Sequence, residues 1–530
     1  LPVSASGKLD RSALPAPPTD RPEVATGYRP PLGERETLLA ALWSQLLGVE
    51  RVGRDDSFFE LGGDSILGIR MIARARRAGV ELTVPQLFRH QTIAALAALA
   101  APEPVAAPPA VPVDSTSRFP LTPLQREMLR EAASAPGRGL YVVPAEAVVD
   151  GNLDPDALRA AFTRLAAHHP ILRTSVDPVS HTVHARAEPV FRVEDWREVP
   201  DAEQRRRRRE LIEQEWRDGF DPGTAPLSRL SVVRLGERRH SLLWTRHNVL
   251  LDGWSFARLF DDLLRLHAAL RDGTPQPALV EPAPFAGYVD WLARHADRAA
   301  TQLDGGLLGG RPKRLFEPEA GPAAGPYREL RMPLPAHVEP FVHRQRLTLS
   351  TVLEAAWAIV LARRTGSQDV RFGLVFSTRP AELPGIESAV GLLINTLPSA
   401  VRVPAGTPVL GWLHELRERA VRMQELSAAS LPVLRQRHGP LWDTLLLLHN
   451  YPHGFDGTLP GDLTLVDTQG FSQVGAAVTV SVDPRPLRLA MLFDPDRATE
   501  AAVRGLGTDL AAALAAMVAD PDRPVGEVLR

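Results

Sequence analysis

The stretch APEPVAAPPAVPVDSTS, residues 101–117, constrains the fold more than any other part of the chain. Proline lacks a backbone N–H and resists helix formation, and the stretch contains few large apolar side chains. The stretch is therefore predicted to be a semi-extended linker that does not itself pack into a hydrophobic core. The 530-residue chain is also longer than one hydrophobic core usually serves, so we expect at least two folded units.

The segment before this linker, residues 31–100, predicts a small four-helix bundle. In ERETLLAALWSQLLGV the leucines and Trp43 recur at helical spacing on one face. In GGDSILGIRMIARARRAG, Asp64 or Ser65 can cap the helix start and Gly79 suits its end. Two shorter helices are expected at VPQLF and TIAALAALA, the second capped by Thr92. Residues 1–30, rich in proline, serine and alanine, predict a tail or linker without a core.

The segment after the linker, residues 118–530, predicts an α/β body. Strand-like runs such as HSLLWTRH, VRFGLVFS, TLLLLHN and GAAVTVSV alternate with helical runs such as WSFARLFDDLLRLHAAL. Two further helices are expected at LTPLQREML and LDPDALRAAFTRLAAHHP, capped by Thr122 and Asp154, each followed by a proline in the first turn. Because the segment exceeds the usual size of one domain, we expect two subdomains that meet at a cleft.

Composition narrows the function. Sixty-one basic against 63 acidic residues give a net charge of -2, which argues against a nucleic acid or an anionic membrane as the main partner. The one basic block, residues 205–209, is expected to be a solvated helix face. The absence of cysteine excludes disulfides, thiolate metal sites and a catalytic thiol, and no zinc spacing, Walker loop or dinucleotide fingerprint appears. We expect no metal.

The beginning of the chain and its hydropathy bear on location. No secretory signal and no uninterrupted apolar run long enough to span a bilayer is seen, so a cytoplasmic protein is expected. The first residue is Leu1 rather than Met, which favours a piece of a longer polypeptide.

Two places can carry chemistry. The first is Ser65, which follows Gly62, Gly63 and Asp64 at a helix start, where the positive end of the helix dipole favours a phosphate. Either Asp64 or Ser65 merely caps the helix, or the serine hydroxyl is modified. Local chemistry favours the cap.

The second place is RHNVLLDGWS, residues 246–255, a strand ending in His247, then a loop, then a helix from Trp254. An Asp-Gly turn at Asp252 and Gly253 can aim side chains into a cleft. The plainer alternative is a buried His247 bonded to backbone, with Asp252 capping the next helix.

The first place resembles the peptidyl carrier proteins of nonribosomal peptide synthetases, whose signature is an LGGDS-type turn, here residues 61–65. The resemblance implies that Ser65 carries a 4′-phosphopantetheine arm, attached by a phosphopantetheinyl transferase, that holds an aminoacyl or peptidyl thioester. SGKLDRSALP, residues 6–15, resembles the closing motif of an adenylation domain. Residues 1–30 would then be the tail of an upstream adenylation domain, and Lys8 would be inert without the rest of it.

Residues 118–530 resemble the condensation domains of the same synthetases. The matching motifs, in order, are LTPLQREML, HHPILRTSV, RHNVLLDGWS, YVDWL, FSTRPAELPGIESAVGLLINTLP and PLWDTLLLLHNYP. The resemblance implies two chloramphenicol-acetyltransferase-like lobes in a V, an N-lobe at about 118–285 and a C-lobe at about 286–530, with a tunnel between them. The donor acyl group would come from the carrier at Ser65. The acceptor amine would come from a downstream carrier domain, as in antibiotic or siderophore biosynthesis.

The family pattern HHxxxDG assigns roles to the 247–253 loop. His247 matches the first histidine, read as structural, and Asn248 stands where the second, catalytic histidine is expected. Asp252 is implied to be an architectural ion-pair partner, with Arg379 the first candidate for its cation and Arg173 the second. A carboxamide cannot accept a proton near neutral pH, and general base catalysis contributes ~10²–10⁴-fold. This copy is therefore expected to be impaired.

Two other functions remain open. An epimerisation domain also uses HHxxxDG after a carrier, and a non-catalytic recruitment domain keeps the fold, loses the motif and docks a tailoring enzyme. The resemblance further makes His168 and His169 fold determinants, and places His449 and Tyr451 at the tunnel wall.

Overall fold

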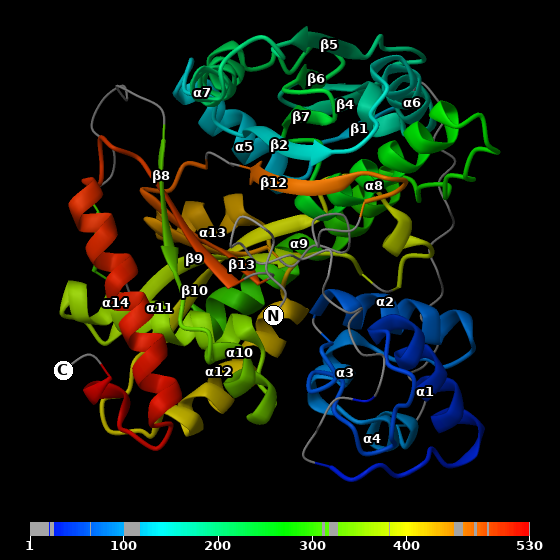
Figure 1. Cartoon of the computed structure of the whole chain (residues 1–530). Coiled ribbons are helices and arrows are strands. Elements are labelled where there is room, and N and C mark those ends of the chain that lie inside the picture. Colours follow the sequence, from blue (N-terminus) through cyan, green and yellow to red (C-terminus); the bar gives the residue numbers. More distant parts are fainter. Residues whose placement is uncertain are drawn as a thin grey trace, which may run out of the picture. The chain divides into compact units, whose positions relative to one another are not determined.

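The computed structural model describes residues 21, 26–63, 65–99, 117–309, 313–316, 327–380, 382–449, 459–470, 474–484 and 487–528. The chain separates into two compact units (Figure 1). The first comprises residues 1–104 with 342–348, and the second comprises the remainder. Two folded units were predicted from the linker, which itself lies outside the described residues up to residue 116.

The described part of the first unit contains four helices ahead of the linker. They are α1 (Gly33–Leu47), α2 (Ser65–Arg77), α3 (Val84–Arg89) and α4 (Ile93–Ala97). The predicted apolar face of α1 is buried: Trp43 is fully enclosed and meets the Phe58 ring edge-on at 5.0 Å. Thr92 caps α4 as expected, by accepting the Ala95 N–H. That these helices make a four-helix bundle stays a prediction.

The strands of the second unit, within its described residues, form three sheets. The three-stranded sheet has the order β1-β4-β3, the five-stranded sheet β12-β2-β7-β6-β5, and the six-stranded sheet β10-β9-β11-β13-β14-β8. The strands are β1 (Arg118–Pro120), β2 (Val142–Asp150), β3 (Thr174–Val176), β4 (Ser180–Val183), β5 (Val190–Asp195), β6 (Ser228–Arg234), β7 (Arg239–His247), β8 (Arg328–Pro333), β9 (Asp369–Ser377), β10 (Ile394–Arg402), β11 (Thr444–Leu448), β12 (Thr464–Gly470), β13 (Val478–Pro484) and β14 (Leu487–Phe493).

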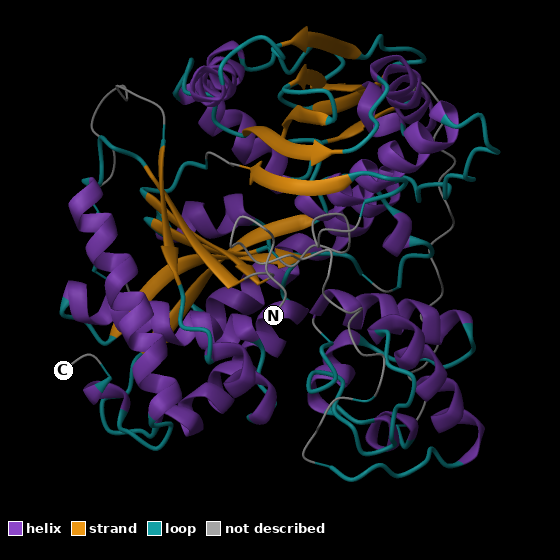
Figure 2. Cartoon of the chain, in the orientation of Figure 1, coloured by secondary structure: helices purple, strands orange, loops and turns teal. Residues whose placement is uncertain are grey.

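Helices flank both large sheets, as the alternation of strand and helix patterns predicted (Figure 2). They are α5 (Pro123–Ser134), α6 (Pro155–His168), α7 (Asp201–Asp218), α8 (Gly253–Arg271), α9 (Phe285–Leu307), α10 (Val338–Arg344), α11 (Leu349–Thr365), α12 (Val409–Glu425), α13 (Leu431–His438) and α14 (Glu500–Ala519), with 3₁₀ turns at Pro170–Arg173, Ile386–Ser388 and Val525–Glu527. Helices α5 and α6 begin at their predicted caps, Thr122 and Asp154.

One strand crosses between the two halves of this unit. Strand β12 lies late in the sequence, yet it pairs antiparallel with β2 and forms the edge of the five-stranded sheet. A division of the lobes at about residue 285 therefore omits this strand exchange. Hereafter the first lobe means the five-stranded sheet with its helices, and the second lobe means the six-stranded sheet with its helices.

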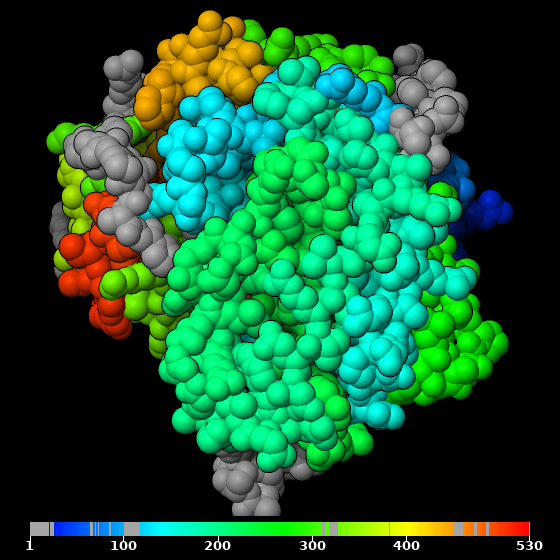
Figure 3. Space-filling model, turned by 90° about the horizontal axis from the view of Figure 1, so that it is seen from above, coloured from blue at the N-terminus to red at the C-terminus, as the bar shows by residue number. Residues whose placement is uncertain are grey.

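Two helices refine the expectations from composition. The arginine block lies on α7, on the face of the first lobe seen in Figure 3, and most of it is exposed; Arg208, however, points inward and pairs with the buried Glu146 at 2.6 Å. Helix α14 is long and apolar enough, by length and composition, to cross a membrane. It packs on α11 and β14 and buries Leu506, Leu510 and Leu514.

Candidate functional site

The predicted strand–loop–helix of the second place is present. Strand β7 ends at His247, and α8 begins at Gly253 with Asp252 as its N-cap. The His247 side chain is buried, and its Nδ1 accepts the Val249 N–H at 3.1 Å, so the ring proton sits on Nε2. Burial lowers the pKa of His247 to about 4. The imidazole is therefore neutral at physiological pH and ties the loop to itself.

Asn248 is held by its backbone. Its N–H donates to the Tyr141 carbonyl at 2.7 Å, and residues 248–250 form a turn. The side chain is half-buried, and among the described residues no hydrogen bond holds its carboxamide. The carboxamide can thus donate to and accept from a ligand, whereas it has no basic atom to take a proton near neutral pH.

Asp252 fixes the far end of the loop. Its carboxylate, 1% exposed, accepts the Ser255 N–H at 2.7 Å and the Leu393 N–H at 3.0 Å. The Arg379 guanidinium, which is also buried, lies 3.1 Å from it. The plainer alternative, a buried His247 bonded to backbone with Asp252 as the helix cap, is therefore present. The ion pair that the resemblance implied is present as well, and Arg379 is confirmed as the partner. Arg173 instead donates to the carbonyl oxygens of Ala166 and Ala185, both at 3.1 Å.

The glycine-rich segment before β10 completes this junction. The Asp252 N–H donates to the Gly391 carbonyl at 3.0 Å, and the Ser255 hydroxyl donates to the same carbonyl at 2.9 Å. A Cβ at Gly391 would lie 2.3 Å from the Phe285 ring, so only glycine lets this backbone come so close. The loop from the first lobe is thereby joined to the second lobe.

Two anchors of the loop were missed in the sequence. Gln125 was seen only as part of LTPLQREML, yet its Nε2 donates to the Val249 carbonyl at 2.7 Å while its Oε1 accepts the Thr122 N–H. A glutamine three residues after a threonine cap is a recognisable capping box, but its second bond is not visible in the sequence. Tyr141, the acceptor for Asn248, carried no local signal.

The other histidine and tyrosine candidates have no hydrogen bond to the 247–253 loop among the described residues. His169 is buried and its pKa falls to about 3 because burial disfavours the charged ring, which suits a fold determinant. His449 bonds to Asp483 at 2.9 Å, and Tyr451 lies outside the described residues. No group of three metal-ligating side chains occurs in the described part of the chain.

At the first candidate site, the turn before Ser65, the structure describes the backbone. Helix α2 begins at Ser65, whose side chain, like the whole of Asp64, lies outside what the structure describes. Gly62 has a φ of +92°, and a Cβ at Gly63 would lie 2.4 Å from the Phe58 ring. The two glycines thus bring the turn tightly onto the core directly before a 13-residue helix, a position that suits a phosphate on Ser65. Lys8 is not described.

An open groove elsewhere on the first lobe is separate from this loop. It has a volume of about 620 Å³ and lies between β5 and α7, lined by Glu194, Trp196, Arg207, Glu210, Leu211, Glu213, Gln214 and Arg217. None of these residues belongs to the 247–253 loop.

Comparison with known proteins bears on both places. Residues 115–305 and 325–529 match the Condensation domain family, and residues 37–100 match the family described as Phosphopantetheine attachment site. The AMB antimetabolite synthetase AmbE of Pseudomonas aeruginosa is 32% identical over 576 aligned residues, which cover 99% of this chain and 26% of that protein. Tyrocidine synthase 2 of Brevibacillus parabrevis is 30% identical over 490 residues, 85% of this chain and 13% of the relative.

Solved structures share the fold of the second unit. The first condensation domain of the calcium-dependent antibiotic synthetase superposes with a TM-score of 0.67 at 18% identity, covering 78% of this chain and 99% of that one. The starter condensation domain of rhizomide synthetase gives 0.65 at 17%, covering 78% and 97%. At such identity the likeness shows the fold alone, that of condensation domains.

The chain belongs to the condensation-domain family and carries, ahead of that domain, a site for covalent attachment of 4′-phosphopantetheine, as in nonribosomal peptide synthetases. Condensation domains are peptide-bond-forming acyltransferases. The predicted family is thus confirmed. The chain spans 6–9% of the length of the three linear gramicidin synthase proteins that it matches.

Proposed function

We propose that this chain carries a donor acyl group on Ser65 and forms an amide at the 247–253 loop, with Asn248 slowing that step. The observation that carries the proposal is which side chains of the loop are already hydrogen-bonded and which one is not. His247 and Asp252 are buried and bonded within the protein, whereas the half-buried Asn248 carboxamide, between them, has no partner among the described residues. A loop held in this way presents one side chain to a ligand.

The chemistry assigns a limited role to that side chain. In aminolysis of a thioester the amine nitrogen bonds to the carbonyl carbon, the C–S bond breaks and the thiol is released. The amine must also lose a proton, which a histidine can take and an asparagine cannot. A free amine is already nucleophilic, so a carboxamide that orients it retains part of the acceleration. The 4′-phosphopantetheine arm supplies the thiol on which the donor is carried. Ser65 holds that arm at the positive end of α2.

The proposal implies partners. An upstream adenylation domain activates the donor, a phosphopantetheinyl transferase modifies Ser65, and a downstream carrier domain brings the acceptor amine, in the cytoplasm. Aminoacyl or peptidyl thioesters are the substrates, and neither nucleic acid nor membrane is required. The curated relatives that carry such domains include synthetases named for peptide antibiotics, which supports a product of that kind.

The test loads the chain with a donor aminoacyl arm and offers an aminoacyl carrier domain as the acceptor. Product formation is followed by intact-protein mass for the chain as it stands and for Asn248→His. We expect Asn248→His to raise the condensation rate by about 10²–10⁴-fold. Ser65→Ala is the matched control and should neither load nor react.

Other outcomes identify the rival functions. Solvent deuterium entering the donor Cα in the absence of an acceptor would indicate epimerisation. Tight binding of a tailoring enzyme, with no dipeptide from either Asn248 or Asn248→His, would indicate a recruitment domain and overturn the proposal.

A further inference from the structure

The segment from Gly137 to Val142, which joins α5 to β2, has an unusual backbone. Gly137 and Gly139 have φ angles of 80° and 65°, and Tyr141 follows with a φ of 63°. Tyr141 is one of two non-glycine residues with positive φ in the described part of the chain. A bulky residue keeps this left-handed conformation only where surrounding contacts impose it.

The Tyr141 end of the segment touches the candidate site. Its side chain is buried and its hydroxyl donates to the Glu131 carboxylate on α5. Its carbonyl accepts the Asn248 N–H at 2.7 Å. This hydrogen bond ties the backbone of Asn248 to that of Tyr141.

The Arg138 end of the segment is bound to the second lobe. The guanidinium makes two bonds to the Asp494 carboxylate, at 2.8 and 3.1 Å, and the two side chains are 7% and 1% exposed. It also lies over the Tyr327 ring, 5.3 Å from its centroid. Asp494 directly follows β14, and its N–H bonds to the Ala477 carbonyl at 3.0 Å, so this anchor belongs to the six-stranded sheet.

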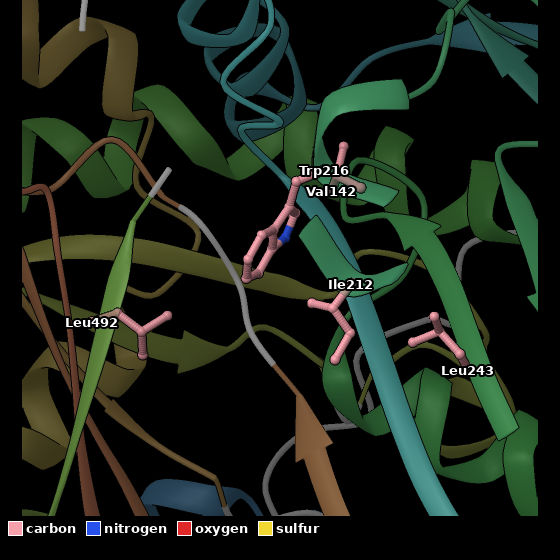
Figure 4. Close-up of a cluster of buried hydrophobic side chains, with 5 residues drawn as sticks. All are labelled: Val142, Ile212, Trp216, Leu243 and Leu492. Carbon is pink, nitrogen blue, oxygen red and sulfur yellow. The ribbon is translucent and has the colours of Figure 1, made fainter. Parts of the chain in front are cut away.

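Close packing surrounds Gly139 and Val142 of the segment. Trp216 of α7 leaves no room for a Cβ at Gly139, which would lie 2.5 Å from the Trp216 carbonyl oxygen. One buried cluster spans both lobes: β14 contributes one member, and β2, β7 and α7 of the first lobe contribute the others (Figure 4). Its members are Val142, Ile212, Trp216, Leu243 and Leu492.

We propose that Arg138 and Tyr141 are positioning residues for the side chain at 248. The pair between Arg138 and Asp494 fixes the segment against the second lobe, and the Tyr141 carbonyl passes that constraint to the backbone of Asn248. The direction of the side chain at 248 then depends on an ion pair between the lobes. The consequence for catalysis rests on the proposed function of the 247–253 loop.

The experiment compares Asp494→Asn with Asp462→Asn in the full chain carrying Asn248→His. Asp462 bonds to Arg271 of α8 at 2.6 Å and does not touch the 137–142 segment, so it is the control for loss of an ion pair elsewhere in the chain. For each chain we measure hydrogen exchange at the amide of residue 248, together with kcat and the KM for the acceptor.

In Asp494→Asn we expect about 10-fold faster exchange at residue 248, because local opening there becomes easier. We expect kcat to fall by about 10–100-fold with KM within about threefold, because displacement of a positioned group by ~1 Å costs up to ~10²-fold. Asp462→Asn should leave both unchanged. Tyr141→Phe, which loses the hydroxyl's bonds to Glu131 and to the Gly475 backbone, should also raise the exchange rate at residue 248.

Unchanged exchange at 248 in Asp494→Asn, or equal effects of the two aspartate variants, would overturn the proposal. If Asp494→Asn fails to fold, Arg138→Lys keeps the charge, loses the two-pronged bond and is judged on the same criteria. If no Asn248→His chain forms product, the proposed function fails, while the exchange comparison still decides the coupling.

Discussion

Replacement of Asp252 by asparagine tests whether its charge holds the loop to the second lobe. The two side chains have the same shape, so the change removes charge and one acceptor without creating a cavity. The Asp252 carboxylate accepts from Ser255, Leu393 and Arg379. An asparagine offers one carbonyl oxygen, and its NH₂ group would face one of those donors.

The magnitude follows from burial. The Arg379 side chain is 2% exposed and would lose its counter-charge, and removal of one member of a buried pair costs about 3–5 kcal/mol. A buried donor left without an acceptor adds about 1–3 kcal/mol. We therefore expect Asp252→Asn to lower the free energy of unfolding by at least about 3 kcal/mol.

Urea unfolding followed by tryptophan fluorescence measures this, since the Trp254 ring lies 5.2 Å from the Arg379 guanidinium. Asp369→Asn is the control, because Asp369 pairs with Arg402 in the open, and it should cost under about 1 kcal/mol. Adding Arg379→Gln to Asp252→Asn should recover part of the loss by removing the uncompensated cation. If Asp252→Asn costs no more than Asp369→Asn, the charge does not hold the loop.

Three further predictions follow from contacts near the two sites. Burial lowers the pKa of His247 to about 4 from 6.5, and it lowers equally the pKa of His181, whose Nε2 lies 2.8 Å from the Gln125 Nε2. Between these two pH values the unfolded chain binds more protons than the folded chain, so stability is complete above pH 6.5 and decreases as the pH drops, by up to about 1.4 kcal/mol per pH unit for each ring. Urea midpoints across a range of about pH 4–7 will show this decrease, and a flat profile would contradict it. Gly63→Ala should destabilise the carrier unit by about 1–3 kcal/mol and slow loading of the chain by a transferase, because its Cβ would lie 2.4 Å from the Phe58 ring; loading at the unaltered rate would refute this. Gln125→Ala should cost about 1–3 kcal/mol in urea unfolding because it strips buried backbone groups of their partners, and a loss below about 0.5 kcal/mol would show that water replaces them.

Local chemistry predicted the elements better than their assembly. The caps at Thr92, Thr122 and Asp154 were found because each is a polar residue directly before an apolar helical pattern. Sheet order was not predictable in this way. The pairing of β12 with β2 joins segments more than 300 residues apart, and no local pattern reports such a partner.

In the candidate site, too, local features were predicted and contacts between distant segments were missed. The strand, the loop and the helix start at Asp252 were predicted from the residues, and the family resemblance supplied Arg379 as the partner. The contributions of Gln125 and Tyr141 were missed, because each acts on the loop through a hydrogen bond to its backbone. Such bonds depend only on where the two groups lie in space. Because every residue has the backbone groups involved, the loop sequence does not reveal them. The left-handed Tyr141 is a further case, since a positive φ usually selects glycine.

The contacts that shape the loop bear on what Asn248 changes. Val249 and Asn248 are fixed through backbone groups, and the side chains that brace the loop are those of His247, Asp252 and Gln125. The side chain at 248 contributes to none of these bonds, so the fold does not select between asparagine and histidine there. An exchange at this position should therefore alter proton transfer while stability stays nearly constant. A stability change above about 1 kcal/mol for Asn248→His, in the urea assay used for Asp252, would show that the side chain supports the loop after all.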